Sequence, residues 1–459
     1  MTRNRMVVAC LVLTFAASFA AAQEAAPAAS GGFELGLGTA SLPVDPTDPA
    51  TEYVTYQNLA LKPEFAFGKF GLGLDLTVNF NLRLGSTGEG VEFYEPDWNP
   101  DAAGKSFIEL YLPKIAYIRW AKKGDPLYLK FGSFDDGTLG NGFIMGNYSN
   151  TRFLPGTRIF GAAVDVDGAL FNFPYVGIET FAGNLARLDV VGTRLFARPL
   201  FDMENPILKN LQLGATIAAD REPLIYDSDE TNDDEGSVAV FGIDGRLPIL
   251  GTPMVSLATF ADIAFQPEGR WGTMIGLGGR LASIFTYGAQ LRLLAPGFIP
   301  TYFDGSYDIF RHAKYAVVSE APEGSAYAGW LASIGTSLMA DVIIFNVTLS
   351  GPFGAEDSGK ITDYPQLRGI FTIGEGLLGG FSLDAFYEKY YLGADTDQVP
   401  LGTGDFFTDL IDPNNAVIGA KINYATGPAV LSLLYNLRYD PSATNNFIVT
   451  SSLMSSIRF

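Results

Sequence analysis

Apolar and polar side chains alternate along many short stretches of the chain, which is the pattern of β-strands with two different faces. The clearest stretch is the eleven residues 74–84, where Leu, Val and Phe alternate with Asp, Thr, Asn and Arg. A tilted strand needs about 9 to 11 residues to cross a membrane. Residues 58–67 alternate in the same way, and the link 68–71 predicts a hairpin between the two strands.

Similar alternation recurs to the end of the chain, at residues 211–217, 287–293 and 431–439. The last thirteen residues, 447–459, carry Leu453, Ile457 and the terminal Phe459 on their apolar parity. A closed sheet lets one such parity meet lipid while the other meets water. The chain is therefore predicted to be all-β: a transmembrane antiparallel up-and-down β-barrel.

The connections between these stretches alternate in length, as they do in barrels with short turns at one rim and long loops at the other. The short ones lie near residues 68–71, 121–126, 202–208, 250–253, 374–378 and 425–428. The long ones lie near residues 42–52, 86–105, 137–157, 222–236, 296–325, 351–363 and 393–415. Counting the strands between them gives about 20, with 16 and 18 also open, and an even number puts both termini on the same side.

One stretch, residues 327–349, has nearly the length of a membrane-spanning helix. Asp341 and Asn346 interrupt it with polar side chains. We therefore expect two strands that meet near residues 340–341.

Composition agrees with a barrel that faces lipid. Charged residues make up 17% of the chain and aromatic residues 13%, with 52 glycines. An average soluble protein has about 25% charged residues. The alternative that composition leaves open is a secreted β-sandwich or propeller.

The N-terminus has the features of a cleaved Sec signal. Arg3 and Arg5 precede an apolar run, and small residues follow it up to Ala22. An acylated Cys10 is the alternative, although few apolar residues precede this cysteine. The expected division is a signal peptide at 1–22, a short periplasmic lead-in at 23–31 and the barrel at 32–459.

Removal of the signal leaves no cysteine and a single histidine, His312. Disulfides, thiolate metal sites and cysteine nucleophiles are thereby excluded, as is chemistry that needs two histidines. The mature chain has 28 basic and 50 acidic residues, a net charge of −22. Such acidity argues against binding nucleic acid, and we expect no cofactor.

The C-terminal pattern with Leu453, Ile457 and Phe459 resembles the β-signal of outer-membrane proteins of diderm bacteria, and the architecture resembles that of porins. The resemblance implies an outer-membrane location and contact with outer-membrane lipids, periplasmic chaperones and the barrel-assembly machinery. By analogy with porins, the chain could also form a homo-oligomer.

In general porins, the third outer loop folds into the barrel and narrows it. Here the third long connection, 137–157, is rich in Gly, Asn and apolar residues and uncharged until Arg152. Such a loop suits packing against the inner wall, with an external position as the alternative. Opposed charges could then select solutes at the narrowest section. The candidate lining residues are Lys62, Asp75, Asn79, Arg83, Asp135, Asp136, Arg152, Arg158, Arg292 and Arg438.

Two other patterns invite chemistry but are better explained without it. The acidic run 227–235 has Asn232 where an EF-hand loop needs Gly, so we expect a solvated outer loop. His312 lies near Asp304 and Asp308, but no Gly-x-Ser-x-Gly elbow accompanies it. We expect no enzymatic activity and no metal site.

A barrel of this size is wide enough for an aqueous interior. The sequence therefore predicts a porin-like channel for passive diffusion of small hydrophilic solutes or ions. The net acidity favours a mild preference for cations, which lumen arginines could reverse. The alternatives are a carrier of hydrophobic substrates and a non-conducting surface adhesin or structural barrel.

Overall fold

The structure is a computed structural model that describes residues 29–46, 51–83, 90–154, 156–225, 236–339, 342–354, 359–395, 399, 402–439 and 447–458. Its strands form one sheet that closes on itself, because β1 (Ala29–Pro43) pairs with both β2 (Tyr53–Phe67) and β22 (Phe447–Arg458). The other strand pairings join neighbours along the chain in antiparallel order, apart from one local exchange described next. The predicted up-and-down barrel is confirmed.

The exchange of partners occurs where two long strands are each interrupted. β3 (Phe70–Leu74) and β4 (Leu76–Arg83) both pair with β2 and together form one strand of the wall. On their other side, β3 pairs with β6 (Ile115–Trp120), while β4 pairs with β5 (Gly90–Phe93). The 22 strand segments therefore make a barrel of 20 strands, the number that the sequence favoured.

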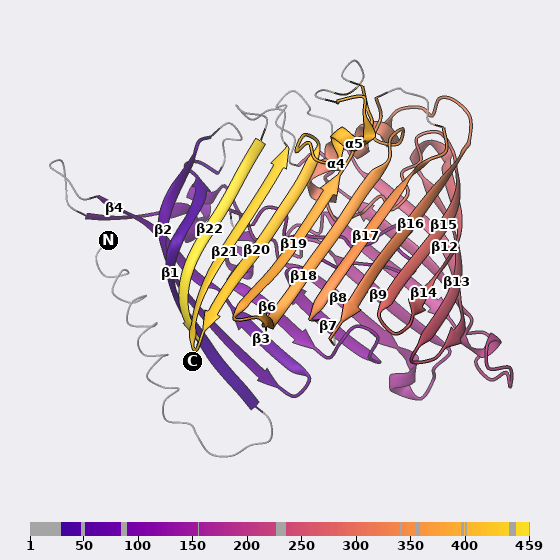
Figure 1. The fold of residues 1–459 in the computed structure, drawn as a ribbon, viewed down its shortest axis with the longest axis horizontal. Coiled ribbons are helices and arrows are strands. Elements are labelled where there is room, and N and C mark those ends of the chain that lie inside the picture. Colours follow the sequence, from indigo (N-terminus) through magenta and orange to yellow (C-terminus); the bar gives the residue numbers. More distant parts are fainter. Residues whose placement is uncertain are drawn as a thin grey trace.

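The remaining strands follow in chain order around the wall (Figure 1). They are β7 (Leu127–Gly132), β8 (Gly161–Asp167), β9 (Val176–Ala182), β10 (Val190–Ala197), β11 (Gln212–Asp220), β12 (Val238–Gly251), β13 (Val255–Gln266), β14 (Arg270–Leu281), β15 (Phe285–Leu294), β16 (Tyr327–Leu338), β17 (Ile343–Pro352), β18 (Gln366–Leu378), β19 (Phe381–Lys389), β20 (Ala416–Thr426) and β21 (Ala429–Tyr439).

Alternate residues of each strand face opposite sides of the wall. In β12, Val238, Val240 and Asp244 are buried, whereas Phe241 and Ile243 are exposed. The same alternation puts large apolar side chains around the outside of the barrel, among them Ile217, Ile275, Leu291, Ile334 and Leu453. An apolar outer surface on a closed sheet is what a bilayer requires. The architecture is that of a porin-like outer-membrane barrel.

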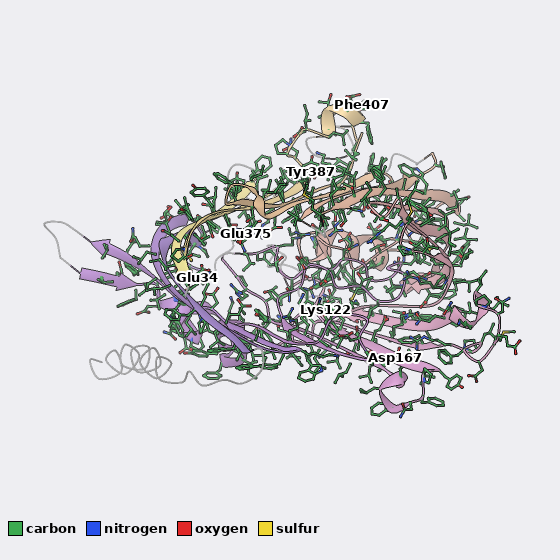
Figure 2. The ribbon with its side chains drawn as sticks, turned by 60° about the horizontal axis from the view of Figure 1, so that its bottom comes forward. Glu34, Lys122, Asp167, Glu375, Tyr387 and Phe407 are labelled. Carbon is green, nitrogen blue, oxygen red and sulfur yellow. The ribbon has the colours of Figure 1, made fainter. Side chains whose placement is uncertain are left out.

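The helices of the described residues are short and lie in the connections, and none is long and apolar enough to cross a membrane. Helices α4 (Tyr307–Ser319) and α5 (Phe406–Asp409) lie at the same end of the barrel (Figure 1), and Phe407 of α5 projects away from it (Figure 2). The others are η1 (Glu95–Asp97), α2 (Pro100–Ala103), α3 (Phe107–Tyr111), η2 (Leu112–Lys114), η3 (Gly168–Phe171), η4 (Leu208–Asn210) and η5 (Pro267–Gly269).

Several local predictions can be compared with these elements. Residues 327–349 form β16 and part of β17, as expected, and not a helix. The strand expected at 74–84 is divided at Asp75, next to a shift in the register with β6. β1 begins at Ala29, so the end of the expected lead-in belongs to the first strand. The expected signal peptide and the acidic run at 227–235 lie outside the described residues.

Candidate functional site

The connection between β7 and β8, which we call loop 3 (residues 133–160), lies against the inner face of the wall. The Asn141 amide donates a hydrogen bond to the Asp262 carboxylate at 2.8 Å. Asp262 lies opposite Asp244 across β12 and β13, and Asp244 is buried, so both belong to the parity that faces the barrel interior. Loop 3 is therefore attached to the wall from inside.

Arg194 of β10 holds this attachment together. Its Nε and Nη2 donate to the two carboxylate oxygens of Asp244 at 2.8 and 2.6 Å, and its Nη1 donates to Glu179 at 3.3 Å. Glu179 also accepts a hydrogen bond from the Gly140 N–H at 3.1 Å. A Cβ on Gly140 would lie 2.8 Å from Arg194 Nε, and its φ is +57°, so this approach requires glycine.

Apolar side chains fill the space between loop 3 and the wall. Leu139 sits over Gly192 of β10, where an added Cβ would come within 2.7 Å of it. Phe143 stacks on Phe298 at 5.6 Å between ring centroids, and both are buried. Phe298 in turn covers Gly272 of β14. Glycines in the wall thus leave room for large side chains that the connections contribute, and burial of those side chains stabilises the packing.

The connection between β15 and β16, which we call the α4 segment (residues 295–326), binds loop 3. The Gly146 N–H donates to the Phe303 carbonyl at 3.0 Å. At the other end of the segment, Arg270 of β14 donates to the last-turn carbonyls of Val317 and Val318 in α4 at 2.9 and 3.0 Å. A cation at a helix C-terminus satisfies carbonyls that have no partner within the helix. The two connections and the wall form one packed body.

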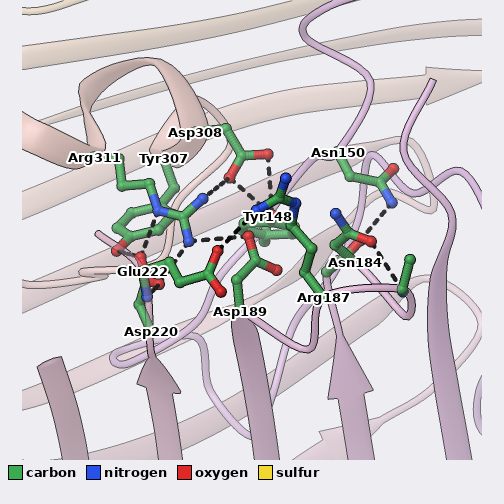
Figure 3. A network of polar contacts seen from close by, with 12 residues as sticks. Tyr148, Asn150, Asn184, Arg187, Asp189, Asp220, Glu222, Tyr307, Asp308 and Arg311 are labelled. Carbon is green, nitrogen blue, oxygen red and sulfur yellow. Dashed lines mark hydrogen bonds and ion pairs between the residues drawn. The ribbon is translucent and has the colours of Figure 1, made fainter. Parts of the chain in front are cut away.

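A buried ion cluster joins α4 to the wall (Figure 3). Arg311 donates from Nε and Nη2 to the two oxygens of Asp220, the last residue of β11, both at 2.5 Å. Its Nη2 also lies 3.0 Å from Asp189, and its Nη1 lies 3.9 Å from Asp308. The Tyr307 hydroxyl donates to Asp220 at 2.6 Å. One guanidinium is therefore shared by three buried carboxyl groups.

Three carboxyl groups face one guanidinium in this cluster, and Asp308 is the carboxyl group whose protonation reduces the excess of negative charge. Burial raises the pKa of Asp308 from 3.8 to about 7; the positive charge of Arg311 opposes this rise, while the negative charges of Asp189 and Asp220 add to it. The Tyr148 hydroxyl, from loop 3, donates to the same carboxyl at 2.9 Å. Near neutral pH, a proton on Asp308 removes the third negative charge.

We expect the docking of α4 to weaken as pH rises. The docked state binds the Asp308 proton more tightly than an undocked state whose pKa is near 3.8, so docking is strongest below that pH and is lost progressively up to about 7. Asp304 on the same segment also has a pKa raised by burial and contributes in the same direction, while burial lowers the pKa of its partner Lys314.

Amide hydrogen exchange of residues 307–319, corrected for intrinsic rates, measures this dependence. Asp308→Asn keeps the acceptor for Tyr148 and removes the titration, so its pH profile should be flatter than that of the wild type. The same steep profile in both proteins would contradict the assignment.

A second buried cluster lies on the other side of loop 3. Glu388 of β19 accepts hydrogen bonds from Arg152 Nη2 at 2.8 Å, from Arg368 Nε at 3.0 Å and from the Ser306 hydroxyl. Arg152 also donates from Nε to the Gly305 carbonyl at 2.7 Å. Side chains from loop 3, the α4 segment and β18 therefore meet at one carboxylate.

A chamber of about 890 Å³ remains inside the barrel, bounded by loop 3, α4, and strands β19 to β22. The acidic residues in its lining are Glu109 and Asp308, and Asp308 has the raised pKa given above. The basic residues in the lining are more numerous; they are Lys105, Arg152, Arg158, Arg187 and Arg438. The described lining thus presents more positive than negative charge.

Three of the residues predicted from the sequence lie together in the structure. Arg158 Nη2 lies 2.5 Å from Asp75 Oδ2, and Lys62 Nζ lies 3.9 Å from the same oxygen. Arg152 belongs to the Glu388 cluster, and Arg292 donates two hydrogen bonds to Gln290 on its own strand.

The other predicted residues are scattered. Asn79 is buried against Asp97, Asp136 lies 3.5 Å from Lys130, and Asp135 is exposed. Arg438 lies over the Phe153 ring, 4.8 Å from its centroid. The side chains of Arg83 and Phe459 are outside the described part of the chain, while Leu453 and Ile457 are exposed on β22.

The sequence did not point to the Arg311 cluster, the Arg194 cluster or Glu388. Arg194 lies between Thr193 and Leu195, in a stretch that does not alternate apolar and polar side chains, so the local pattern does not single it out. Arg311 and Asp220 are 91 positions apart, and Arg152 and Glu388 are 236 apart. Only the closure of the barrel and the course of its connections bring such pairs together.

No family model and no curated protein matches the chain. Among solved structures, it is similar to OccK2 (OpdF) of Pseudomonas aeruginosa in complex with glucuronate, with 8% identity, 95% of this chain and 99% of that chain covered, and a TM-score of 0.32. It is also similar to a BenF-like porin from Pseudomonas fluorescens Pf-5, with 13% identity, 94% and 98% coverage, and a TM-score of 0.34. At such low similarity, the function has to be inferred from this barrel's own geometry.

Proposed function

We propose that this protein is a channel of the outer membrane through which small hydrophilic solutes and ions diffuse passively. The observation that carries the proposal is the chamber of about 890 Å³ inside a closed barrel with an apolar exterior. Solutes would cross along the polar, inward-facing side chains of the wall, past loop 3 and α4. No catalytic step is needed for this role.

Loop 3 is the element that would set the width of the channel. Its attachment to Glu179 and Asp262 supports this role, since both acceptors belong to strands of the inner wall. The Arg152 contact with Glu388 ties the same loop to β19 as well. A segment held at both sides of a barrel reduces the area open to solutes.

The charge of the chamber supports a mild preference for anions, opposite to what the net acidity of the chain suggested. Ion selection depends on the charges beside the path rather than on the sum over the molecule. Arg152 and Arg158 are partly neutralised by Glu388 and Asp75, which keeps the preference mild. The described lining offers an anion more partners than a cation.

Single-channel recording tests the proposal. The refolded mature chain in a planar bilayer should give stable ohmic steps, with a reversal potential of the anion-selective sign in a salt gradient. Uptake of hydrophobic substrates without ion current would favour a carrier. A folded barrel that shows neither would favour an adhesin or a structural role.

A further inference from the structure

A second cavity, of about 140 Å³, lies between loop 3, the α4 segment and strands β15 to β19. Its lining shares no residue with that of the larger chamber. Its charged lining residues are Arg292 and Arg368 on the basic side and Asp304 and Glu388 on the acidic side. What this cavity can bind depends on how these four charges are already partnered.

Both carboxylates have cationic partners. Asp304 lies 2.5 Å from Lys314 Nζ, which is itself buried. Glu388 forms ion pairs with both Arg152, at 2.8 Å, and Arg368, at 3.0 Å. A single carboxylate therefore serves two guanidinium groups, and positive charge is left over beside the cavity.

Among the residues that the structure describes, Arg292 adds a cation with no ionic partner. It is 7% exposed, and no carboxylate of the described residues lies within ion-pair distance of it. Its Nε and Nη2 donate to the neutral Gln290 side chain at 3.0 and 2.8 Å, and its guanidinium carbon lies 6.0 Å from the Phe143 ring centroid. A buried charge without an opposite charge is costly. Neither contact supplies that opposite charge.

We propose that this cavity is a binding site for a small oxyanion, with Arg292 as its principal ligand. Guanidinium groups bind carboxylate and phosphate oxygens through charge-assisted hydrogen bonds. The hydroxyl groups of Tyr327 and Ser350 also line the cavity and can donate to the remaining oxygens.

The volume limits the size of the ligand. A volume of about 140 Å³ is enough for an ion of the size of phosphate. The inference rests on the proposed function only for the route by which the ion arrives. Binding itself does not require that the barrel conducts.

Calorimetric titration of the refolded full chain with inorganic phosphate tests the site. Arg292→Gln should weaken phosphate binding about ten- to a hundredfold, since a hydrogen bond to a charged group is lost along with the charge. Arg292→Lys, which keeps the charge but not the fork, should give an intermediate affinity. The matched control is Arg280→Gln on β14, an exposed arginine outside the cavity, which should bind like the wild type.

The mobility of unheated samples in gel electrophoresis shows whether each variant has folded. A folded wild type that binds no phosphate, or equal binding by wild type and Arg292→Gln, would overturn the site and leave the channel proposal intact. Phosphate binding that depends on Arg292 in a barrel that never conducts would uphold the site and overturn the channel.

Discussion

Replacing residues 138–147 at the tip of loop 3 with an Asn-Gly turn should raise the single-channel conductance severalfold. Gly137 and Tyr148 already exchange two backbone hydrogen bonds, at 3.0 and 2.8 Å, so a two-residue turn can close the shortened hairpin there. The removed part contains Asn141, which is bonded to Asp262 of the wall, and Phe143, which packs on Phe298 of the α4 segment. Conductance in a planar bilayer is the measurement.

The control for this variant is a change in a connection that points away from the barrel. Phe407→Ser alters an exposed side chain of α5 (Figure 2) and should leave the conductance as in the wild type. If the shortened loop conducts like the wild type while both proteins are folded, loop 3 does not narrow the path.

Arg311→Met should release α4 from the wall. The substitution leaves Asp189, Asp220 and Asp308 buried without their shared cation. Removing one partner from a buried ion cluster costs about 3–5 kcal/mol, which is large compared with the stability of a helix of this size. Hydrogen exchange at residues 307–319 should accelerate strongly, and the channel current should become larger and noisier.

Arg221→Met is the matched control, because Arg221 is the exposed neighbour of Asp220. It should leave both hydrogen exchange and current unchanged. If Arg311→Met behaves in the same way, the ion cluster is not what holds α4 in place.

The strands could be predicted from the sequence because each strand has one face toward lipid and one toward the interior, and its residue types alternate accordingly. Stretches such as 74–84 and 431–439 alternate between a side chain for lipid and one for the interior, and the lengths of the connections alternate with them. The division at Asp75 was missed, since it depends on a change of partner from β6 to β5 that leaves no mark in the local pattern.

Helix α4 was missed for a different physical reason. Its buried face carries Asp308, Arg311 and Lys314 beside Tyr307 and Val318. Apolar residues alone therefore do not recur with the helical period along this segment. These charges are tolerated inside only because the wall supplies the opposite charge of Asp220 to Arg311, and the connection before α4 supplies the Tyr302 carbonyl to Lys314. A pattern read along the chain cannot show partners that lie on distant strands.

The reversal potential of single channels in a KCl gradient tests the central claim most directly. An open hydrophilic path past a basic lining predicts stable ohmic steps and a reversal potential on the chloride side. A correctly folded barrel that never carries current would contradict the channel, and a reversal potential on the potassium side would contradict the assignment of the chamber lining as the selective element.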